Sequence, residues 1–170
     1  VQHSSGKRQI FIQMVSVGFD ASVVHHINPS LKRLLGRYAY FIQMLKELSC
    51  YQFAPIEIEI DGQIQFSAGA IISKGRFYGG NYLLTNNANS SEPGFTVILF
   101  ERGGIRSVLR VGWALLTDSV SNLKGVRVVK ATEVKLLSPS GVPLQTDGDP
   151  SGFTSAKISN SKSSIFVATL

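Results

Sequence analysis

The clearest pattern of apolar and polar positions lies between residues 56 and 66. Isoleucines alternate with glutamates over residues 56–60, and apolar side chains alternate with glutamines over residues 63–66. A period of two is typical of a strand with one buried face. Because Asp61-Gly62 separates the two runs and Asp-Gly favours a two-residue turn, the sequence predicts an antiparallel hairpin here.

Other runs of β-branched and apolar residues, bounded by glycine, proline or polar loops, predict further strands. These runs cover residues 10–17, 70–72, 95–100, 126–137, 142–146, 154–158 and 164–169. The run at 70–72 continues the second arm of the hairpin, and nothing interrupts residues 126–137. Each is therefore predicted as one continuous strand.

Three segments have helical character, over residues 21–27, 30–49 and 105–116. Asn28-Pro29 disfavours continuation of the first helix, and Ser30 is the predicted N-cap of the second. We interpret Trp113 on the third helix, and an apolar stripe on the second, as core side chains because they recur at helical spacing. The stripe consists of Leu34, Tyr38, Phe41, Leu45 and Leu48.

Many strands joined by turns, without alternation of strand and helix, favour a mainly β fold. We predict an antiparallel β-sandwich with two or three peripheral helices. Because no linker-like run divides the 170 residues, we expect residues 1–170 to form a single domain.

The composition of the chain limits its expected cellular compartment and the classes of partner it could bind. Apolar residues make up 44% of the chain, yet no run of about 18 apolar residues could span a bilayer. The lone Cys50 cannot form an internal disulfide, which favours the cytoplasm, with at most peripheral membrane association. The net charge of +6 favours a nucleotide or an anionic membrane surface. Nucleic acid is disfavoured because the basic residues are dispersed, and a homodimer is left open.

Two carboxylates flank the glycine of Asp147-Gly148-Asp149, directly after an apolar strand. As a pattern, Asp-Gly is mainly a turn signal, and Asp61-Gly62 shows the same pair in a hairpin. Carboxylates this close can also hold Mg²⁺ or accept a proton from a hydroxyl, which is the chemistry of phosphoryl transfer. Both interpretations stay open at this point.

Three motifs resemble, in order, those of the second half of the diacylglycerol kinase-like lipid kinases. They are residues 17–21 (VGFDA) with the following residues 34–40 (LLGRYAY), residues 75–80 (GRFYGG), and residues 144–149 (LQTDGD). The resemblance runs from about residue 10 to the C-terminus. It implies the β-sandwich domain of a two-domain kinase that transfers the γ-phosphate of ATP to a lipid hydroxyl.

By this resemblance, Asp147 is the candidate general base, and Asp149 assists the nucleotide or metal. Gly75, Tyr78, Gly79 and Asp20 are expected at the cleft that meets the substrate. ATP and Mg²⁺ are implied as cofactors, both bound mainly by an N-terminal domain with a "GGDGT" motif. That motif does not occur here, so this chain alone is expected to be inactive.

Two positions depart from the family pattern. Pro93 stands where the family has an aspartate that binds a structural metal, so no metal site is predicted, although Glu92 could substitute after a shift of one residue. Ser22 stands where sphingosine kinases have an acidic residue that meets the amine of the sphingoid base. The resemblance therefore favours diacylglycerol as substrate, although Asp20 lies two residues away.

Two alternatives remain from the sequence. One is a domain of the related NAD kinase type; the other is a noncatalytic β-sandwich that binds a ligand or a partner. A hydrolase finds no support, because no serine has His and Asp neighbours at a usable spacing and Cys50 lacks a base. His25 and His26 are adjacent on a helix, point about 100° apart and are expected at the surface.

Overall fold

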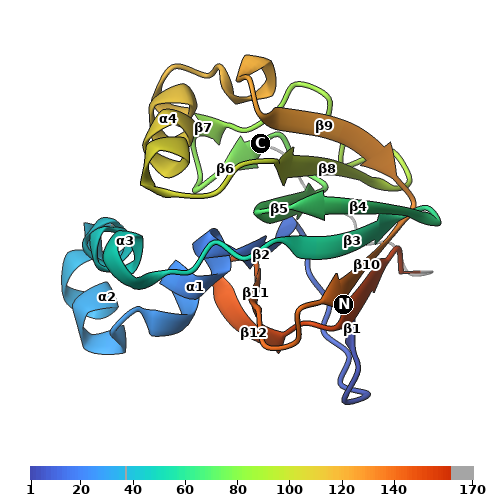
Figure 1. Cartoon of the computed structure of the whole chain (residues 1–170), viewed down its shortest axis with the longest axis horizontal. Coiled ribbons are helices and arrows are strands. Elements are labelled where there is room, and N and C mark those ends of the chain that lie inside the picture. Colours follow the sequence, from blue (N-terminus) through green and yellow to red (C-terminus); the bar gives the residue numbers. More distant parts are fainter. Residues whose placement is uncertain (37, 162–170) are drawn as a thin grey trace.

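Two antiparallel sheets form the body of the protein, with helices at one end (Figure 1). The computed structural model describes residues 1–36 and 38–161. The five-stranded sheet has the order β1 (Gln2–His3), β13 (Ala156–Ser159), β10 (Glu133–Ser138), β3 (Ile56–Ile60) and β4 (Gln63–Ser67). The six-stranded sheet has the order β12 (Asp149–Phe153), β11 (Pro143–Thr146), β2 (Met14–Gly18), β5 (Gly69–Ser73), β8 (Phe95–Phe100) and β9 (Val126–Ala131). A separate small hairpin joins β6 (Phe77–Tyr78) to β7 (Tyr82–Leu83).

The main core lies between the two sheets, which confirms the predicted antiparallel sandwich. Buried side chains of β2, β5 and β8 pack in one cluster with those of β3, β10 and β13. The predicted hairpin is β3–β4: its isoleucines at 56, 58 and 60 are buried, and Ile60 pairs with Gln63 across the turn. Asp61 and Gly62 both have positive φ (46° and 86°), as such a turn requires.

The middle strands of the six-stranded sheet are buried on both faces. A second apolar cluster, including Ile71, Ile98 and Leu84, lies on the face away from the five-stranded sheet. Strands covered on two sides have continuous apolar runs rather than alternating ones. This explains why the sequence of β5 and β8 shows no period of two.

Two predicted long strands are each divided between the sheets. Ala68 separates β4 from β5, and Thr132 separates β9 from β10, and in both cases the chain passes from one sheet to the other. The prediction of continuous strands was wrong at these places. A corner between sheets needs only one residue between two β segments, so composition does not reveal it.

The helices are α1 (Phe19–His26), α2 (Pro29–Leu35), α3 (Tyr38–Cys50) and α4 (Ile105–Leu116), with a 3₁₀ turn η1 (Val120–Asn122). Asn28, not Ser30, caps α2, because its Oδ1 accepts the N–H of Ser30 at 2.8 Å and Pro29 occupies the first helical position. Gly36, with φ 54°, ends α2. The single helix predicted over 30–49 is therefore two helices.

The apolar stripes of these helices are exposed, which corrects their assignment to the core. Leu34 is 80% exposed, Tyr38, Phe41 and Leu45 are each at least half exposed, and Trp113 is 68% exposed. Helical spacing identifies an amphipathic surface but not what covers it. In the described part of the chain, no helix is long and apolar enough to cross a bilayer. The strand predicted at 164–169 lies outside the described residues.

Candidate functional site

Asp20 lies where β2 passes into α1, and it joins the three motifs found in the sequence. Its carboxylate accepts hydrogen bonds from the hydroxyls of Tyr78 and Ser16, and from Gln145 Nε2 at 3.4 Å. Gly18 precedes α1 with φ 100°, and a Cβ there would lie 3.1 Å from the carbonyl oxygen of Ala68. Only glycine allows β5 to approach so closely at this entry to the helix.

Tyr78 presents a neutral hydroxyl to this carboxylate. Burial of the hydroxyl, and then the negative charge of Asp20, raise the pKa of Tyr78 well above its usual value. The phenol therefore stays a hydrogen-bond donor over the whole physiological range. Asp20 and Tyr78, expected at one cleft from separate motifs, are in direct contact.

Asp147 and Gly148 form a tight turn between β11 and β12, with φ values of 49° and 89°. The carboxylate of Asp147 accepts three backbone N–H groups at the start of β2: Oδ2 from Ile12 at 2.7 Å, and Oδ1 from Gln13 at 2.9 Å and Met14 at 2.8 Å. The turn thus fixes the carboxylate against residues far away in sequence.

Gln145 connects the turn to the Asp20 cluster. Its Oε1 accepts the N–H of Gly148 at 2.8 Å, while its Nε2 contacts Asp20. Gln145 and Ser16 were not predicted as site residues. Gln145 lies inside the motif at residues 144–149, and this position could have identified it as a site residue. For Ser16 the sequence offers no indication beyond its place on a buried strand.

Asp149 has different partners from Asp147. It is the first residue of β12, its side chain is 75% exposed, and one oxygen lies 3.5 Å from Lys32 Nζ on α2. The ring of Tyr40 lies 5.3 Å from the same ammonium. Hydrogen bonding to the Tyr40 side chain, and then the negative charge of Asp149, raise the pKa of Lys32. The structure therefore places an exposed carboxylate and an ammonium beside the turn.

The glycine loop at residues 75–80 carries Tyr78 on β6. Gly79 and Gly80 have positive φ (58° and 96°) and form the turn to β7. Gly75 lines a polar hollow of about 880 Å³, together with Arg76, Asn86 and Lys130. None of the site carboxylates lines this hollow, so it is separate from the Asp20 cluster.

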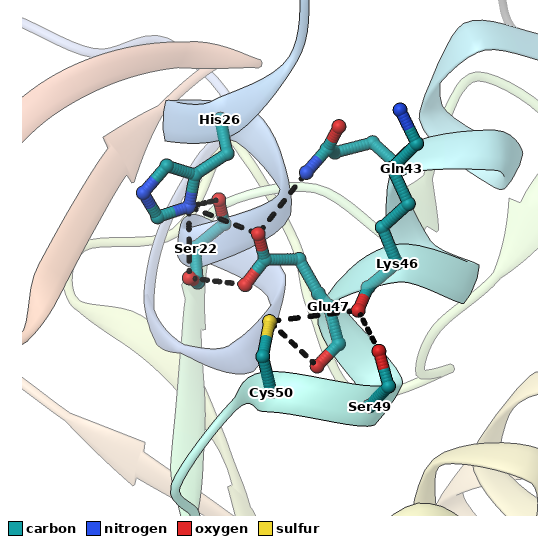
Figure 2. A network of polar contacts seen from close by, with 7 residues as sticks. All are labelled: Ser22, His26, Gln43, Lys46, Glu47, Ser49 and Cys50. Carbon is teal, nitrogen blue, oxygen red and sulfur yellow. Dashed lines mark hydrogen bonds and ion pairs between the residues drawn. The ribbon is translucent and has the colours of Figure 1, made fainter.

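Ser22 is buried and faces Glu47 of α3 (Figure 2). Its hydroxyl donates to Glu47 Oε2 at 2.9 Å, and Glu47 Oε1 lies 3.0 Å from His26 Nδ1. The hydroxyl and the carboxylate approach the same ring nitrogen, so this group is not arranged as a nucleophile relay. It ties α1 to α3.

The histidines do not share a site. His25 Nε2 lies 2.7 Å from the carbonyl oxygen of Leu144, whereas His26 pairs with Glu47. The His25 ring also packs at 5.1 Å from the ring of Phe153. Cys50 is exposed at the end of α3.

The polar loop near Pro93 is held by a lysine. Lys74 Nζ donates to the carbonyl oxygens of Glu92 and Gly94, each at 2.9 Å. The Glu92 carboxylate lies 3.5 Å from Lys130 Nζ. Burial and then the neighbouring Lys130 lower the pKa of Lys74. Within residues 1–36 and 38–161, no three His, Cys, Asp or Glu side chains gather as a metal site.

Magnesium is therefore expected to give no heat in a calorimetric titration of this chain, because an ammonium already occupies the carbonyl oxygens of this loop. Lys74→Met should lower the free energy of unfolding by about 2 kcal/mol, the scale of two lost charge-assisted hydrogen bonds at a partly exposed site. Lys124→Met, at an exposed position, is the matched control in thermal denaturation. Heat from Mg²⁺ that disappears in Glu92→Gln would show instead that Glu92 binds a metal.

The fold and the site together define an antiparallel β-sandwich domain whose Asp-Gly turn, glycine loop and first helix meet around Asp20. Residues 13–168 match the family described as the YegS C-terminal NAD kinase beta sandwich-like domain. The match covers most of the chain, so the chain belongs to this family.

Curated relatives named diacylglycerol kinase resemble the chain at low identity. The Mycobacterium tuberculosis protein is 26% identical over 152 residues, covering 88% of this chain and 48% of the relative. The Staphylococcus carnosus protein is 26% identical over 167 residues, covering 94% of this chain and 53% of the relative. This chain thus spans about half the length of the curated relatives it matches.

A crystal structure of a diacylglycerol kinase from Bacillus anthracis str. Sterne is similar, with a TM-score of 0.52 and 14% identity. The match covers 88% of this chain and 46% of that chain. At this identity the likeness concerns the fold alone.

Proposed function

We propose that this chain is the substrate-side domain of an ATP-dependent lipid kinase that phosphorylates the hydroxyl of diacylglycerol. The observation that carries the proposal is the meeting of the three motifs, since Asp20 contacts both Tyr78 and Gln145, and Gln145 holds the Asp147-Gly148 turn. The names of the relatives supply the substrate class. A nucleotide-binding half outside this chain would supply ATP.

In this proposal Asp147 is the general base. A carboxylate has about four acceptor sites, and three N–H groups orient this one. The remaining site accepts the proton of the lipid hydroxyl while the oxygen bonds to the γ-phosphorus, and ADP leaves with the electrons of the broken P–O bond. Asp20 and Tyr78, with the turn at Gly79, position the substrate, whereas Gly75 lines the separate hollow.

Magnesium would be held mainly by the phosphates of ATP and by the other half of the enzyme. In proteins, Mg²⁺ is often bound by one or two carboxylates plus phosphates. Of the residues present, Asp149 would supply one such ligand, because it is an exposed carboxylate beside the turn. When bound, the ion neutralises charge on the phosphates. Lys32, paired with Asp149, adds a positive charge near the same place.

A noncatalytic domain is the second candidate, and one observation favours it. Asp61-Gly62 has positive φ values (46° and 86°) within a few degrees of those of Asp147-Gly148, and its carboxylate likewise accepts backbone N–H groups, from Thr132 and Glu133. One Asp-Gly turn on the surface thus already serves structure alone. The family description, which includes NAD kinase, keeps NAD as a substrate to be tested.

The test is phosphorylation by the full-length parent protein, with this 170-residue chain beside it. Diacylglycerol in mixed micelles and NAD in solution are offered separately with ATP and Mg²⁺. We expect turnover of diacylglycerol by the parent and none by this chain. Turnover of NAD alone would replace the proposed substrate, and no turnover of either would favour the noncatalytic domain.

A further inference from the structure

Helix α4 is apolar on two faces, and only one of them packs on the protein. Ala114 is buried and, with Leu115, contacts the second core cluster. The opposite stripe is exposed by more than half of each side chain and consists of Ile105, Leu109, Trp113 and Leu116. Steps of four, four and three residues align these side chains along one stripe of the helix. We call them the α4 stripe.

The α4 stripe is bordered by positive charge. Arg106 and Arg110 follow Ile105 and Leu109 directly, about 100° further round the helix, and both are exposed. Exposed Arg102 lies just before the helix. No Asp or Glu occurs from residue 102 to residue 117. The surface therefore combines four large apolar side chains with cations that α4 itself does not neutralise.

Helix α4 lies beside the β6–β7 hairpin, at the upper left of Figure 1. The nearest carboxylate after the helix, Asp118, accepts the N–H of Leu83 at 3.1 Å, and Glu101 before it pairs with Arg127 at 3.6 Å. These acids are thus engaged with other groups.

We propose that α4 is an interfacial helix that docks the protein on an anionic lipid bilayer. The α4 stripe would enter the boundary between headgroups and acyl chains, and Arg106 and Arg110 would pair with lipid phosphates. Charge complementarity selects this occupant. In a twofold interface between two copies of α4, the same arginines would meet each other and repel.

This inference deepens the proposed function. It rests on that function in one respect: the lipid surface is taken to be the membrane that holds the substrate. The binding itself needs neither ATP nor catalysis. It can therefore be measured on this chain alone. A lipid kinase whose substrate stays in the bilayer gains from an element that holds it there.

Trp113 is the only tryptophan of the chain, so its fluorescence reports directly on the α4 stripe. We expect its emission to shift to the blue with vesicles of phosphatidylcholine and phosphatidylglycerol, and to be quenched by brominated acyl chains. Phosphatidylcholine alone should give a much smaller shift, and added salt should reverse binding. Vesicle binding without any change in Trp113 emission would overturn the proposal.

Two variants and a control separate this surface from the rest. Arg106→Gln with Arg110→Gln should weaken binding to the anionic vesicles roughly tenfold or more, and Leu109→Ser with Leu116→Ser should weaken it at least as much. Ile64→Ser with Phe66→Ser removes exposed apolar side chains from β4 and should leave binding unchanged. An equal loss of vesicle binding in all three double variants would overturn the proposal. It would also be overturned if sedimentation showed a dimer that the α4 variants dissociate while their vesicle binding stays unchanged.

Failure of this inference and failure of the proposed function are distinguishable in the parent protein. With a short-chain diacylglycerol dispersed in water, the α4 variants should keep the turnover of the parent. Normal turnover of the parent, together with vesicle binding that the α4 variants do not change, would contradict only the docking role of α4. Vesicle binding through α4 without any turnover would contradict only the proposed kinase function.

Discussion

Asp147→Asn in the full-length parent protein is expected to lower kcat by about 10²–10⁴-fold, the usual contribution of a positioned general base. The amide cannot take the proton of the lipid hydroxyl, while its oxygen can still accept N–H groups from Gln13 and Met14. We expect KM for diacylglycerol to change little. Initial rates of ATP-dependent phosphorylation in mixed micelles measure both.

Asp61→Asn is a matched control, because Asp61 occupies the same kind of Asp-Gly turn, although its carboxylate also accepts the hydroxyl of Thr132. Each lies at positive φ before a glycine and accepts backbone N–H groups of another segment. The two variants should lose similar unfolding free energy, measured by urea denaturation. If turnover falls equally in both, or only as far as stability falls, Asp147 is a structural residue and the general-base hypothesis is wrong.

The parts of the fold that depend on local patterns were predictable. Alternation and Asp61-Gly62 predicted the β3–β4 hairpin, and Gly103-Gly104 predicted the start of α4 at Ile105. In each case the signal and the structure it specifies lie within a few residues of each other. Local rules decide such elements because turn geometry and side-chain period act over short distances.

Features that depend on distant segments were not predictable from the same patterns. Ala68 and Thr132 are corners between sheets, but the β-rich composition continues through both. The exposed stripe that includes Leu34 and Phe41 has the spacing of a core helix. Hydrophobic spacing tells which side chains share a face, while the covering element comes from elsewhere in the chain.

The candidate site combines both situations. The resemblance to a family placed Asp20 and Tyr78 at one cleft, and in the structure the hydroxyl of Tyr78 donates directly to Asp20. The donors that orient Asp147 come from residues 12–14, more than 130 positions earlier. No sequence pattern marks such backbone donors, because every residue except proline carries one.

The second large effect is expected at Asp20. Asp20→Ala should lower the unfolding free energy of this chain by about 3 kcal/mol, because it leaves the hydroxyls of Tyr78 and Ser16 and the amide of Gln145 without their acceptor in a partly buried place. Urea denaturation followed by circular dichroism measures the change. The loss should also release Gln145, and with it the Gly148 N–H that Gln145 holds.

Asp149→Ala is the matched control, since its carboxylate is exposed and, within residues 1–36 and 38–161, forms an ion pair only with Lys32, across 3.5 Å. We expect it to change the unfolding free energy by less than about 1 kcal/mol.

Tyr78→Phe combined with Asp20→Ala should lower the unfolding free energy by less than the two single changes added together, because both remove the same hydrogen bond. An absorbance titration of tyrosine in Asp20→Ala is an independent test. Without the negative charge of Asp20 the pKa of Tyr78 should fall, yet it should stay above its usual value because burial is the larger cause of its shift. Additive losses with an unmoved tyrosine titration would mean that Asp20 and Tyr78 do not act as a pair, and would remove the link on which the proposed site depends.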